Sequence, residues 1–378
     1  MARLGDVFTI TSGGTPDKKK SAYYTNGTIP WVKTGDLKDR YVSTDVECIT
    51  EEGLNNSSAK LFPPKTVLVA MYGATIGACS ILPYEAATNQ ACAAFLPKEN
   101  ILPTYLYYFL SSKKAQFIKD GVGGAQPNIS AGYLKNVEFQ VISIEQQFEI
   151  VARLNKVYEL IALRKEQLAK LDQLLKSRFI ELFGDPVYNS VGLPTKKLSE
   201  LGSLDRGKSQ HRPRNDPKLL GGPYPLIQTG EVASAGLYIT DYKNTYSELG
   251  LRQSKMWKAG TLCITIAANI AQTAILAFDA CFPDSVVGFV PNKSISAVYM
   301  HYWFGFFQKI LEEQAPQVAQ KNINLKILSE LDVMVPPVEL QDKFIAFVEQ
   351  TDKSKLEIQQ SLDKLELLKK SLMQEYFG

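Results

Sequence analysis

Histidine and cysteine are scarce in this sequence of 378 residues, which holds two histidines and five cysteines. No two cysteines form a CxxC pair, and His211 and His301 complete no cluster with the spacing of metal ligands. We therefore expect no metal site in this chain. We interpret the cysteines as buried thiols of a protein from a reducing compartment.

Motifs that bind nucleotides and methyl donors are also missing. No GxxxxGK[ST] run is present, which excludes a P-loop motor. The chain has neither the glycine-rich cofactor loop of an adenine methyltransferase nor its Asn/Asp-Pro-Pro-aromatic segment. These absences argue against an enzyme that carries its own ATP or methyl donor.

Strong net charge and long hydrophobic runs are absent as well. The formal charge is only +3, so any role with nucleic acid must depend on local basic patches. The longest apolar stretches, such as residues 67–82, contain glycines and have the length of strands in a core. No signal-peptide pattern opens the sequence, and we expect a cytoplasmic protein.

The most prominent feature that is present is helical periodicity from Glu145 to Phe183. At 1.5 Å per residue this helix would be roughly 58 Å long, more than the core of a compact domain needs. Gly184-Asp185-Pro186 predicts its end, because glycine permits a left-handed cap and proline cannot continue the helix. The apolar residues recur at spacings of three and four: Val151, Leu154, Tyr158, Ile161, Leu168, Leu171, Leu175, Phe179 and Leu182.

The chain contains a second copy of this segment and of the region before it. Glu339–Phe377 aligns with Glu145–Phe183 without a gap, at an offset of 194. The pattern indicates two tandem copies of a globular region followed by a long helix. The other matching segments keep their order: residues 29–37 with 224–232, 65–82 with 260–276, 89–97 with 283–291, 104–110 with 298–304, and 125–130 with 319–324.

Each globular region is predicted to be mixed. Short apolar runs bounded by Gly, Pro, Asn and Asp predict strands, whereas residues 104–119 and 298–314 predict amphipathic helices. The fold class is therefore α+β, with two similar mixed α/β domains that have a β-rich core. Because each long helix has an apolar stripe to cover, we expect an antiparallel coiled coil with approximate two-fold symmetry and one domain at each end. The expected boundaries are 1–144 and 184–338 for the domains, and 145–183 and 339–378 for the spacer helices.

Two similar but unequal heads on a stiff rod have the geometry needed to read two separated half-sites of DNA. One turn of B-DNA is about 34 Å, so a rod of roughly 58 Å would place the heads between one and two turns apart. Residues 12–27 and 205–222 both begin at a glycine turn and are both basic, but they share little else. This favours a common framework that docks and loops that select the sequence. A coiled-coil scaffold with two heads for proteins or other ligands is the alternative.

A set of segments, taken in order, matches a known family: SGGTP (Ser12–Pro16), IPWVKTGDL, YGATIG (Tyr72–Gly77), NQACAAFLP, AQPNIS, IEQQFEIV (Ile144–Val151), PPVELQDKFI (Pro336–Ile345) and KSLMQEYFG. In these motifs essentially the whole chain resembles the DNA-specificity (S) subunits of type I restriction-modification systems, which serve in phage defence. The second globular region departs from the pattern, because AANIAQTA replaces the glycine-rich turn and AQKNIN replaces AQPNIS.

The resemblance implies a division of labour between this chain and its partners. It implies two target-recognition domains that each read one half of a split DNA site, and helices that set the gap and hold two methyltransferase subunits. It also implies that this chain is not catalytic. S-adenosylmethionine, ATP and Mg would then belong to the methyltransferase and restriction subunits.

Candidate DNA contacts are polar residues of the loops and turns. For each of them a solvated loop or a turn-forming role is the alternative. In the first loop lysine would neutralise phosphates, and in the second loop arginine and glutamine could form paired hydrogen bonds to base edges. The candidates are Lys18, Lys19, Lys20, Lys33, Tyr72, Gln126 and Asn128 in the first copy, and Arg206, Lys208, Gln210, His211, Arg212, Arg214, Gln228, Asn269, Gln320, Lys321 and Asn322 in the second.

The long helices carry mixed charges, which indicates a partly solvated and partly partner-binding surface. Tyr158, Leu163, Phe344 and Phe347 are candidate contacts with a methyltransferase subunit. Packing in the core is the alternative for these four residues.

A nuclease is the one enzyme class with a loose match in the sequence. Pro16-Asp17 followed by Asp36-Leu37-Lys38 resembles acidic metal ligands with a lysine. The second copy has Gln210-His211 and Glu231-Val232-Ala233 at these places. The match is therefore not a property of the repeated framework, and we interpret it as chance.

Overall fold

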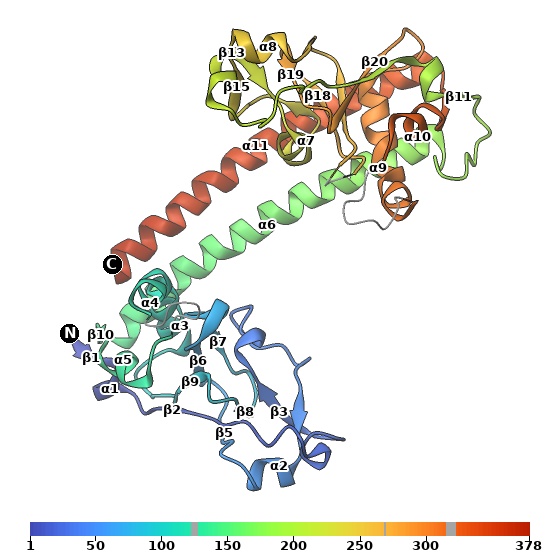
Figure 1. The fold of residues 1–378 in the computed structure, drawn as a ribbon. Helices are drawn as coiled ribbons and strands as arrows, with labels where there is room; N and C mark the ends of the chain where they lie inside the picture. The colour runs from blue at the N-terminus through green and yellow to red at the C-terminus, as the bar shows by residue number, and fades with distance from the viewer. Residues whose placement is uncertain (122–127, 268–269, 315–322) are drawn as a thin grey trace. The chain divides into compact units, whose positions relative to one another are not determined.

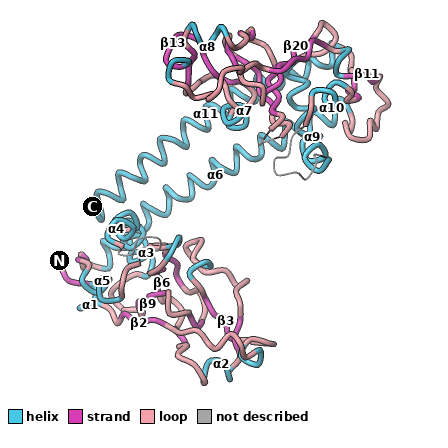
Figure 2. The backbone as a smooth tube through the Cα atoms, in the orientation of Figure 1, coloured by secondary structure: helices cyan, strands magenta, loops and turns pink. Residues whose placement is uncertain are grey.

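The computed structural model describes residues 1–121, 128–267, 270–314 and 323–378. It divides into two compact units: unit 1 is Met1–Lys165 with Gln360–Gly378, and unit 2 is Glu166–Gln359. Each unit therefore combines one globular region with a part of each long helix. Within both, short strands alternate with loops, and helices lie beside them (Figure 2).

Unit 1 contains two four-stranded sheets. Strands β6 (Val67–Ala70) and β9 (Cys92–Phe95) are buried at every position, as their uninterrupted apolar sequences predict. In the first sheet the order is β2 (Ile10–Ser12), β9 (Cys92–Phe95), β6 (Val67–Ala70), β7 (Cys79–Ile81), all antiparallel. In the second it is β4 (Cys48–Ile49), β3 (Ile29–Val32), β8 (Ala86–Thr88), β5 (Leu61–Phe62), with β3 and β8 parallel.

Helix α3 (Pro103–Ser112) covers β6 and β7 (Figure 1). The sequence predicted one helix over residues 104–119. The structure has two helices there, since α3 ends before Lys113 and α4 (Lys114–Asp120) begins after it. The remaining α-helices and strands of the globular region are α1 (Leu4–Val7), α2 (Glu51–Asn55), α5 (Ala131–Asn136), and β1 (Ala2–Arg3) paired with β10 (Glu138–Phe139).

Unit 2 repeats this topology and adds one strand. Its first sheet has the order β12 (Gly202–Arg206), β20 (Val286–Pro291), β17 (Leu262–Thr265), β18 (Thr273–Leu276), with β14 (Tyr238–Ile239) parallel at the edge. Its second sheet is β15 (Asn244–Tyr246), β13 (Leu220–Leu226), β19 (Ala280–Cys281), β16 (Met256–Trp257). The other α-helices and strands of its globular region are α7 (Thr229–Ser234), α8 (Glu248–Arg252), α9 (Ala297–Gln314), α10 (Leu325–Ser329), and β11 (Thr195–Lys197) paired with β21 (Asp332–Met334).

The two long helices are α6 (Ile144–Phe183) and α11 (Val338–Phe377), each of 40 residues. The sequence placed their first residues at Glu145 and Glu339 and their last residues at these same phenylalanines, so the prediction is confirmed to within one residue. The predicted stop is confirmed as well, since Gly184 has a φ of +77°. No described helix combines the length and the apolar character that a bilayer span requires.

Within each unit the two long helices run antiparallel. In unit 1 the start of α6 meets the end of α11, where the guanidinium of Arg153 donates to the hydroxyl of Tyr376. In unit 2 the end of α6 meets the start of α11, and Phe179 packs edge-on against Phe344 at 5.4 Å between ring centroids. The predicted antiparallel pairing and the α+β class are confirmed.

Each globular core is completed by the last phenylalanine of a long helix that belongs to the other sequence copy. Phe183, at the end of the first copy, lies 5.0 Å from Tyr299 in the core of unit 2. Phe377, at the end of the second copy, lies 5.5 Å from Tyr105 in the core of unit 1. Both phenylalanines and both tyrosines are separated by the repeat offset of 194. The two sequence copies therefore do not coincide with the two structural units, because each unit includes the end of the long helix from the other copy.

A buried glutamine ties the first turn of each long helix to its globular region. The amide oxygen of Gln147 accepts from the N–H of Leu102, and its amide nitrogen donates to the carbonyls of Asn100 and Ile142, at 2.8–3.0 Å. Gln341 makes the same three bonds one repeat later, at 2.9–3.0 Å. Both side chains are almost fully enclosed, so these bonds are shielded from water.

Replacing Gln341 with alanine should destabilise unit 2. The change leaves one buried N–H and two buried carbonyls without partners, and such groups cost about 1–3 kcal/mol each when left unsatisfied. We expect a loss of about 2–4 kcal/mol in the free energy of unfolding, measured by urea titration of the full chain. Gln350→Ala, on the exposed face of α11, is the matched control. Equal stability of the two variants would contradict the structural role of the buried amide.

Candidate functional site

A glycine anchors the first loop of each globular region to the neighbouring sheet. A Cβ atom on Gly13 would lie 1.9 Å from the carbonyl oxygen of Thr88, and one on Gly207 would lie 2.2 Å from that of Phe282. In both units the N–H of the next residue donates to that same carbonyl, at 2.9 Å and 3.1 Å. Any larger residue would push the loop away. The two variable loops therefore start from equivalent positions on a common framework.

The lysines of the first loop are exposed, and they differ in their contacts. Lys20 donates to the hydroxyl of Tyr23 at 3.0 Å. The ammonium groups of Lys18 and Lys19 have no partner among the described residues. Lys33, predicted in a separate turn, forms an ion pair of 2.6 Å with Glu47, and this partner raises its pKa. Lys18 and Lys19 are thus the lysines of this set that keep an unshared charge for an anion.

Two predicted contacts from different motifs of unit 1 lie side by side. Tyr72 and Asn128 form an antiparallel bridge, and both side chains are exposed. The bond beside it, from the N–H of Ile129 to the carbonyl of Met71, has a counterpart in unit 2 between Ile323 and Ile266. The remaining candidates in these turns lie outside the described residues: Gln126, Asn269, Gln320, Lys321 and Asn322.

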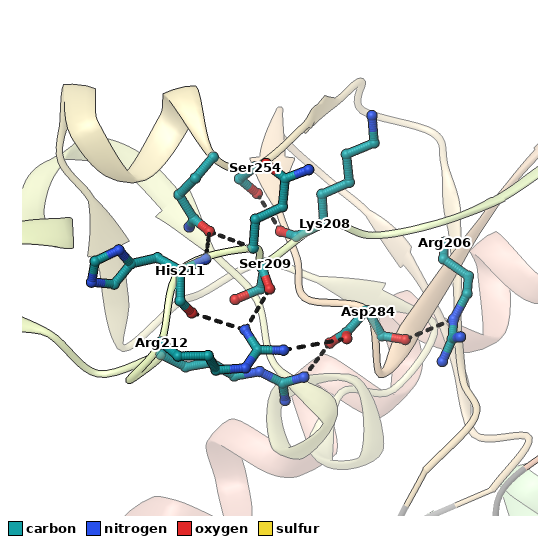
Figure 3. Close-up of polar contacts among 10 residues, drawn as sticks. Arg206, Lys208, Ser209, His211, Arg212, Ser254 and Asp284 are labelled. Atoms are coloured by element: carbon teal, nitrogen blue, oxygen red, sulfur yellow. Dashed lines mark hydrogen bonds and ion pairs between the residues drawn. The ribbon is translucent and has the colours of Figure 1, made fainter.

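In unit 2 the basic segment 206–214 is organised by its own arginine. Arg212 donates through Nη1 to the carbonyl oxygens of Ser209 and His211, at 2.6 Å and 2.8 Å (Figure 3). These two bonds close the loop on itself. We therefore assign Arg212 to holding the shape of the loop, since one end of its guanidinium is already occupied by backbone.

Asp284 gathers the arginines of this segment around one carboxylate. Arg214 donates through Nη2 to Oδ1 of Asp284 at 2.5 Å, and Nη2 of Arg212 lies 3.9 Å from Oδ2. Arg206 donates through Nε to the carbonyl oxygen of the same residue at 3.0 Å. Figure 3 shows Arg206 and Arg212 directed toward Asp284. Lys208 carries no such partner among the described residues, and its ammonium group points away from the cluster.

The other side of the loop is tied down by Gln253. Its amide oxygen accepts from the N–H groups of Gln210 and His211, at 2.7 Å and 3.0 Å. The ring of His211 lies 3.1 Å from Asp216. The pKa of the Asp216 carboxyl is lowered, first by the N–H of Lys218 and then by this ring. These bonds give the loop a defined shape. It carries three candidate DNA-contacting side chains, which are those of Arg214, Lys208 and Gln210.

A cavity of about 480 Å³ beside this loop brings together residues predicted from separate motifs. Arg214 and Gln228 both line it. Polar residues that sequence reasoning missed surround them: Ser209, Asn215, Thr229, Asn244 and Ser285. Asp284 was missed too, although one signal was available, since it aligns with Gln90 in the matched segments 89–97 and 283–291.

The equivalent place in unit 1 has different chemistry. Gln90 stands where unit 2 has Asp284, and its amide oxygen accepts from the hydroxyl of Thr15 at 2.5 Å. The first loop contains lysines but no arginine. The same framework position thus holds a neutral amide in one unit and a carboxylate with arginines in the other.

The four predicted partner contacts on the long helices differ in how far they are buried. Phe344 is fully buried among Phe179, Phe183 and Tyr302, which agrees with packing in the core, the alternative given for it. Leu163 is 45% exposed. Tyr158 and Phe347 are partly buried. The guanidinium of Arg40 lies over the ring of Tyr158, and that of Arg178 lies over the ring of Phe347.

Among the described residues no group of three or more His, Cys, Asp and Glu side chains could hold a metal ion. His301 lies on α9 with its Nδ1 atom 3.1 Å from the hydroxyl of Thr273. Burial lowers its pKa to about 4, so this ring is neutral at pH 7. Four of the five cysteines are buried thiols, as interpreted from the sequence, and Cys48 is partly exposed.

The sequence pattern of one protein family covers nearly the whole chain. The family described as the type I restriction modification DNA specificity domain matches residues 1–173 and again residues 191–368. The chain belongs to this family. The double match agrees with the two copies found by internal alignment.

Individual relatives are more distant. The specificity subunit of the type I restriction enzyme MjaIX of Methanocaldococcus jannaschii is 27% identical over 68% of this chain and 62% of its own length. That of EcoR124I/EcoR124II of Escherichia coli is 30% identical over 40% of this chain and 39% of its own length. The chain thus spans less than two thirds of these curated relatives.

Solved structures share the fold of the entire chain. One is a chain from work on complex assembly and conformational transition of the type I R-M system, with a TM-score of 0.65, 18% identity, and coverage of 100% of this chain and 96% of that one. Another is the type I restriction-modification S subunit from M. genitalium, with a TM-score of 0.56, 16% identity, and coverage of 100% and 95%. At these identities the likeness concerns the fold.

Replacing Arg212 with alanine should loosen the loop 209–216. Without the bonds from Nη1 to two carbonyls, we expect the N–H groups of Gln210 and His211 to exchange with solvent at least about fivefold faster, as loss of about 1 kcal/mol of local stability implies. Hydrogen exchange followed by mass spectrometry measures this directly. Lys208→Ala is the control, since its side chain makes no contact within the loop, and equal exchange in both variants would remove the structural assignment of Arg212.

Proposed function

We propose that this chain is the non-catalytic, sequence-specific DNA-binding subunit of a type I restriction-modification complex, and that it reads a split DNA site. The observation that carries the proposal is the contrast between framework and loops. The two units share individual hydrogen bonds, such as those of Gln147 and Gln341, whereas the loops on Gly13 and Gly207 differ in charge and chemistry. Membership of the family supports DNA as the ligand.

Each globular region would read one half of the site. We propose residues 1–144 and 184–338 as the two target-recognition domains, with 145–183 and 339–378 as the spacer helices. Lys18, Lys19 and Lys208 carry unshared positive charge suited to phosphates. Arg214, Gln210 and Gln228 offer the paired donors and acceptors that base edges require.

Chemistry would reside in partner chains. We propose that two methyltransferase subunits bind the long helices, and that restriction subunits join the assembly with them. S-adenosylmethionine, ATP and Mg would be bound by those chains, in the cytoplasm. Leu163 is exposed on α6 and is the strongest of the predicted helix contacts for a methyltransferase subunit.

Exchanging one recognition domain should change one half of the site. If residues 1–144 are replaced with the first domain of another family member, the complex should methylate a motif with one new half and one retained half. Methylation mapping in the native host, with and without the chain, measures both halves and the gap between them. An unchanged motif, or the loss of both halves together, would contradict the assignment of one half to each domain.

Removing the unshared lysines of the first loop should weaken DNA binding in a salt-dependent manner. Each lost phosphate contact reduces the slope of log affinity against log salt by about 0.9, so Lys18→Ala with Lys19→Ala should lower it by up to about 1.8. The measurement is binding of duplex DNA by the complex with methyltransferase subunits at several salt concentrations. Lys258→Ala, in an exposed ion pair with Asp279, is the control. Binding that is insensitive to salt in the unmodified complex would instead favour a scaffold that does not bind DNA.

A further inference from the structure

We propose that Arg214, held by Asp284, reads a guanine in the half-site bound by unit 2. This inference rests on the proposed function and adds to it a base and the residue pair that recognises it. Arg214 lies in the basic segment, and Asp284 lies just before strand β20, 70 residues further along the chain. The pair exists only because the fold brings these segments together.

The geometry of the pair leaves one edge of the arginine free. Nη2 of Arg214 donates to Oδ1 of Asp284 at 2.5 Å, and the Arg214 side chain is 47% exposed. Its Nη1 and Nε atoms have no partner among the described residues. Nη2 carries two hydrogens and uses one of them on Asp284, so its second hydrogen can still form a two-donor edge with a neighbouring nitrogen of the guanidinium. A guanidinium is planar, so a carboxylate that holds one corner also sets the direction of the remaining donors.

The backbone of Asp284 is held in place by the framework. The carbonyl oxygen of Asp284 accepts from Nε of Arg206, and the carbonyl of Pro283 accepts from the N–H of Val286 to form the turn that enters β20. Pro283 also lines the cavity that contains Arg214. The backbone that carries the Asp284 side chain is therefore held in the turn that enters β20, an inner strand of the sheet.

The surroundings favour a base over a phosphate. A phosphate at Arg214 would approach the negative charge of Asp284, whereas a neutral base edge meets no such repulsion. The cavity beside Arg214 is lined by the neutral amide groups of Gln228, Asn244 and Asn215. Amides and a guanidinium together are the groups that read base edges in the major groove.

Guanine is the base whose major-groove edge matches two adjacent donors. It presents the acceptors N7 and O6, whereas adenine presents one acceptor and one donor. Against any other base, at least one donor of Arg214 would be left without a partner. A well-formed pair of this kind discriminates by roughly 5- to 160-fold.

Unit 1 lacks this arrangement at the equivalent place. Gln90 replaces Asp284 and is occupied by Thr15, and the loop 12–27 contains no arginine. The inference therefore concerns one half of the site only, which makes the other half an internal reference.

The test measures binding and methylation by the complex of the full chain with its methyltransferase subunits. After motif mapping, each guanine in the half-site of unit 2 is replaced in turn with 7-deazaguanine, which lacks the N7 acceptor. We expect one position where this lowers the affinity of the unmodified complex by about fivefold or more. The same replacement should have a smaller effect on the Arg214→Lys complex, because lysine keeps the charge but lacks the planar fork that engages N7 and O6 together. Asp284→Asn should reduce the preference for guanine at that position while steepening the salt dependence.

The outcomes separate this inference from the proposed function. A half-site of unit 2 without guanine, or equal effects of 7-deazaguanine on the unmodified and Arg214→Lys complexes, would overturn the assignment while leaving split-site reading intact. Absence of any motif or DNA binding in the unmodified complex would instead contradict the proposed function. Should Arg214→Lys not fold, Arg214→Ala takes its place, and insensitivity of the unmodified complex to 7-deazaguanine still refutes the proposal. Lys258→Ala, which removes an exposed ion pair with Asp279 in the same unit, should leave the motif unchanged.

Discussion

The architecture depends on the need to cover the apolar stripe of each 40-residue helix. A helix of this length cannot bury its whole stripe against the domain that precedes it, and part of each long helix belongs to unit 1 and part to unit 2. The reciprocal contacts of Phe183 with Tyr299 and of Phe377 with Tyr105 are the result. Neither globular core is complete without a residue from the other sequence copy. Folding of one unit is thereby coupled to the presence of both helices.

The recognition surface depends on the same framework, used in a different way. Gly13 and Gly207 fix where each variable loop leaves the sheet, because a side chain at either place would collide with a backbone carbonyl. Beyond that point the two loops are free to differ. Gln90 and Asp284 occupy equivalent positions, yet one accepts from a threonine and the other orients arginines. A duplicated scaffold can in this way present two unlike surfaces.

Much of the fold could be predicted because its signals are local. The periodicity of the long helices, the offset of 194 and the glycine after Phe183 lie within short stretches of sequence, and the structure agrees with each of them. The prediction was poorer where a residue's neighbours come from elsewhere in the chain. For Phe344 the sequence left a partner contact and core packing as alternatives, and only the fold shows that the aromatic core of unit 2 encloses it. The single helix expected over 104–119 is divided at Lys113, and we found no signal for that break.

The sequence by itself determined the duplication, the α+β class, the extent of the long helices and the basic character of the segment 206–214, since all of these follow from composition and spacing along the chain. Only the tertiary structure decided which basic residues are available to a ligand. Arg212 is occupied by carbonyls of its own loop, whereas Arg214 meets a carboxylate 70 residues away and keeps donors free. The physical reason is that a charged side chain acquires its role from the partner that folding brings within hydrogen-bonding distance, and that partner cannot be identified from its position in the sequence.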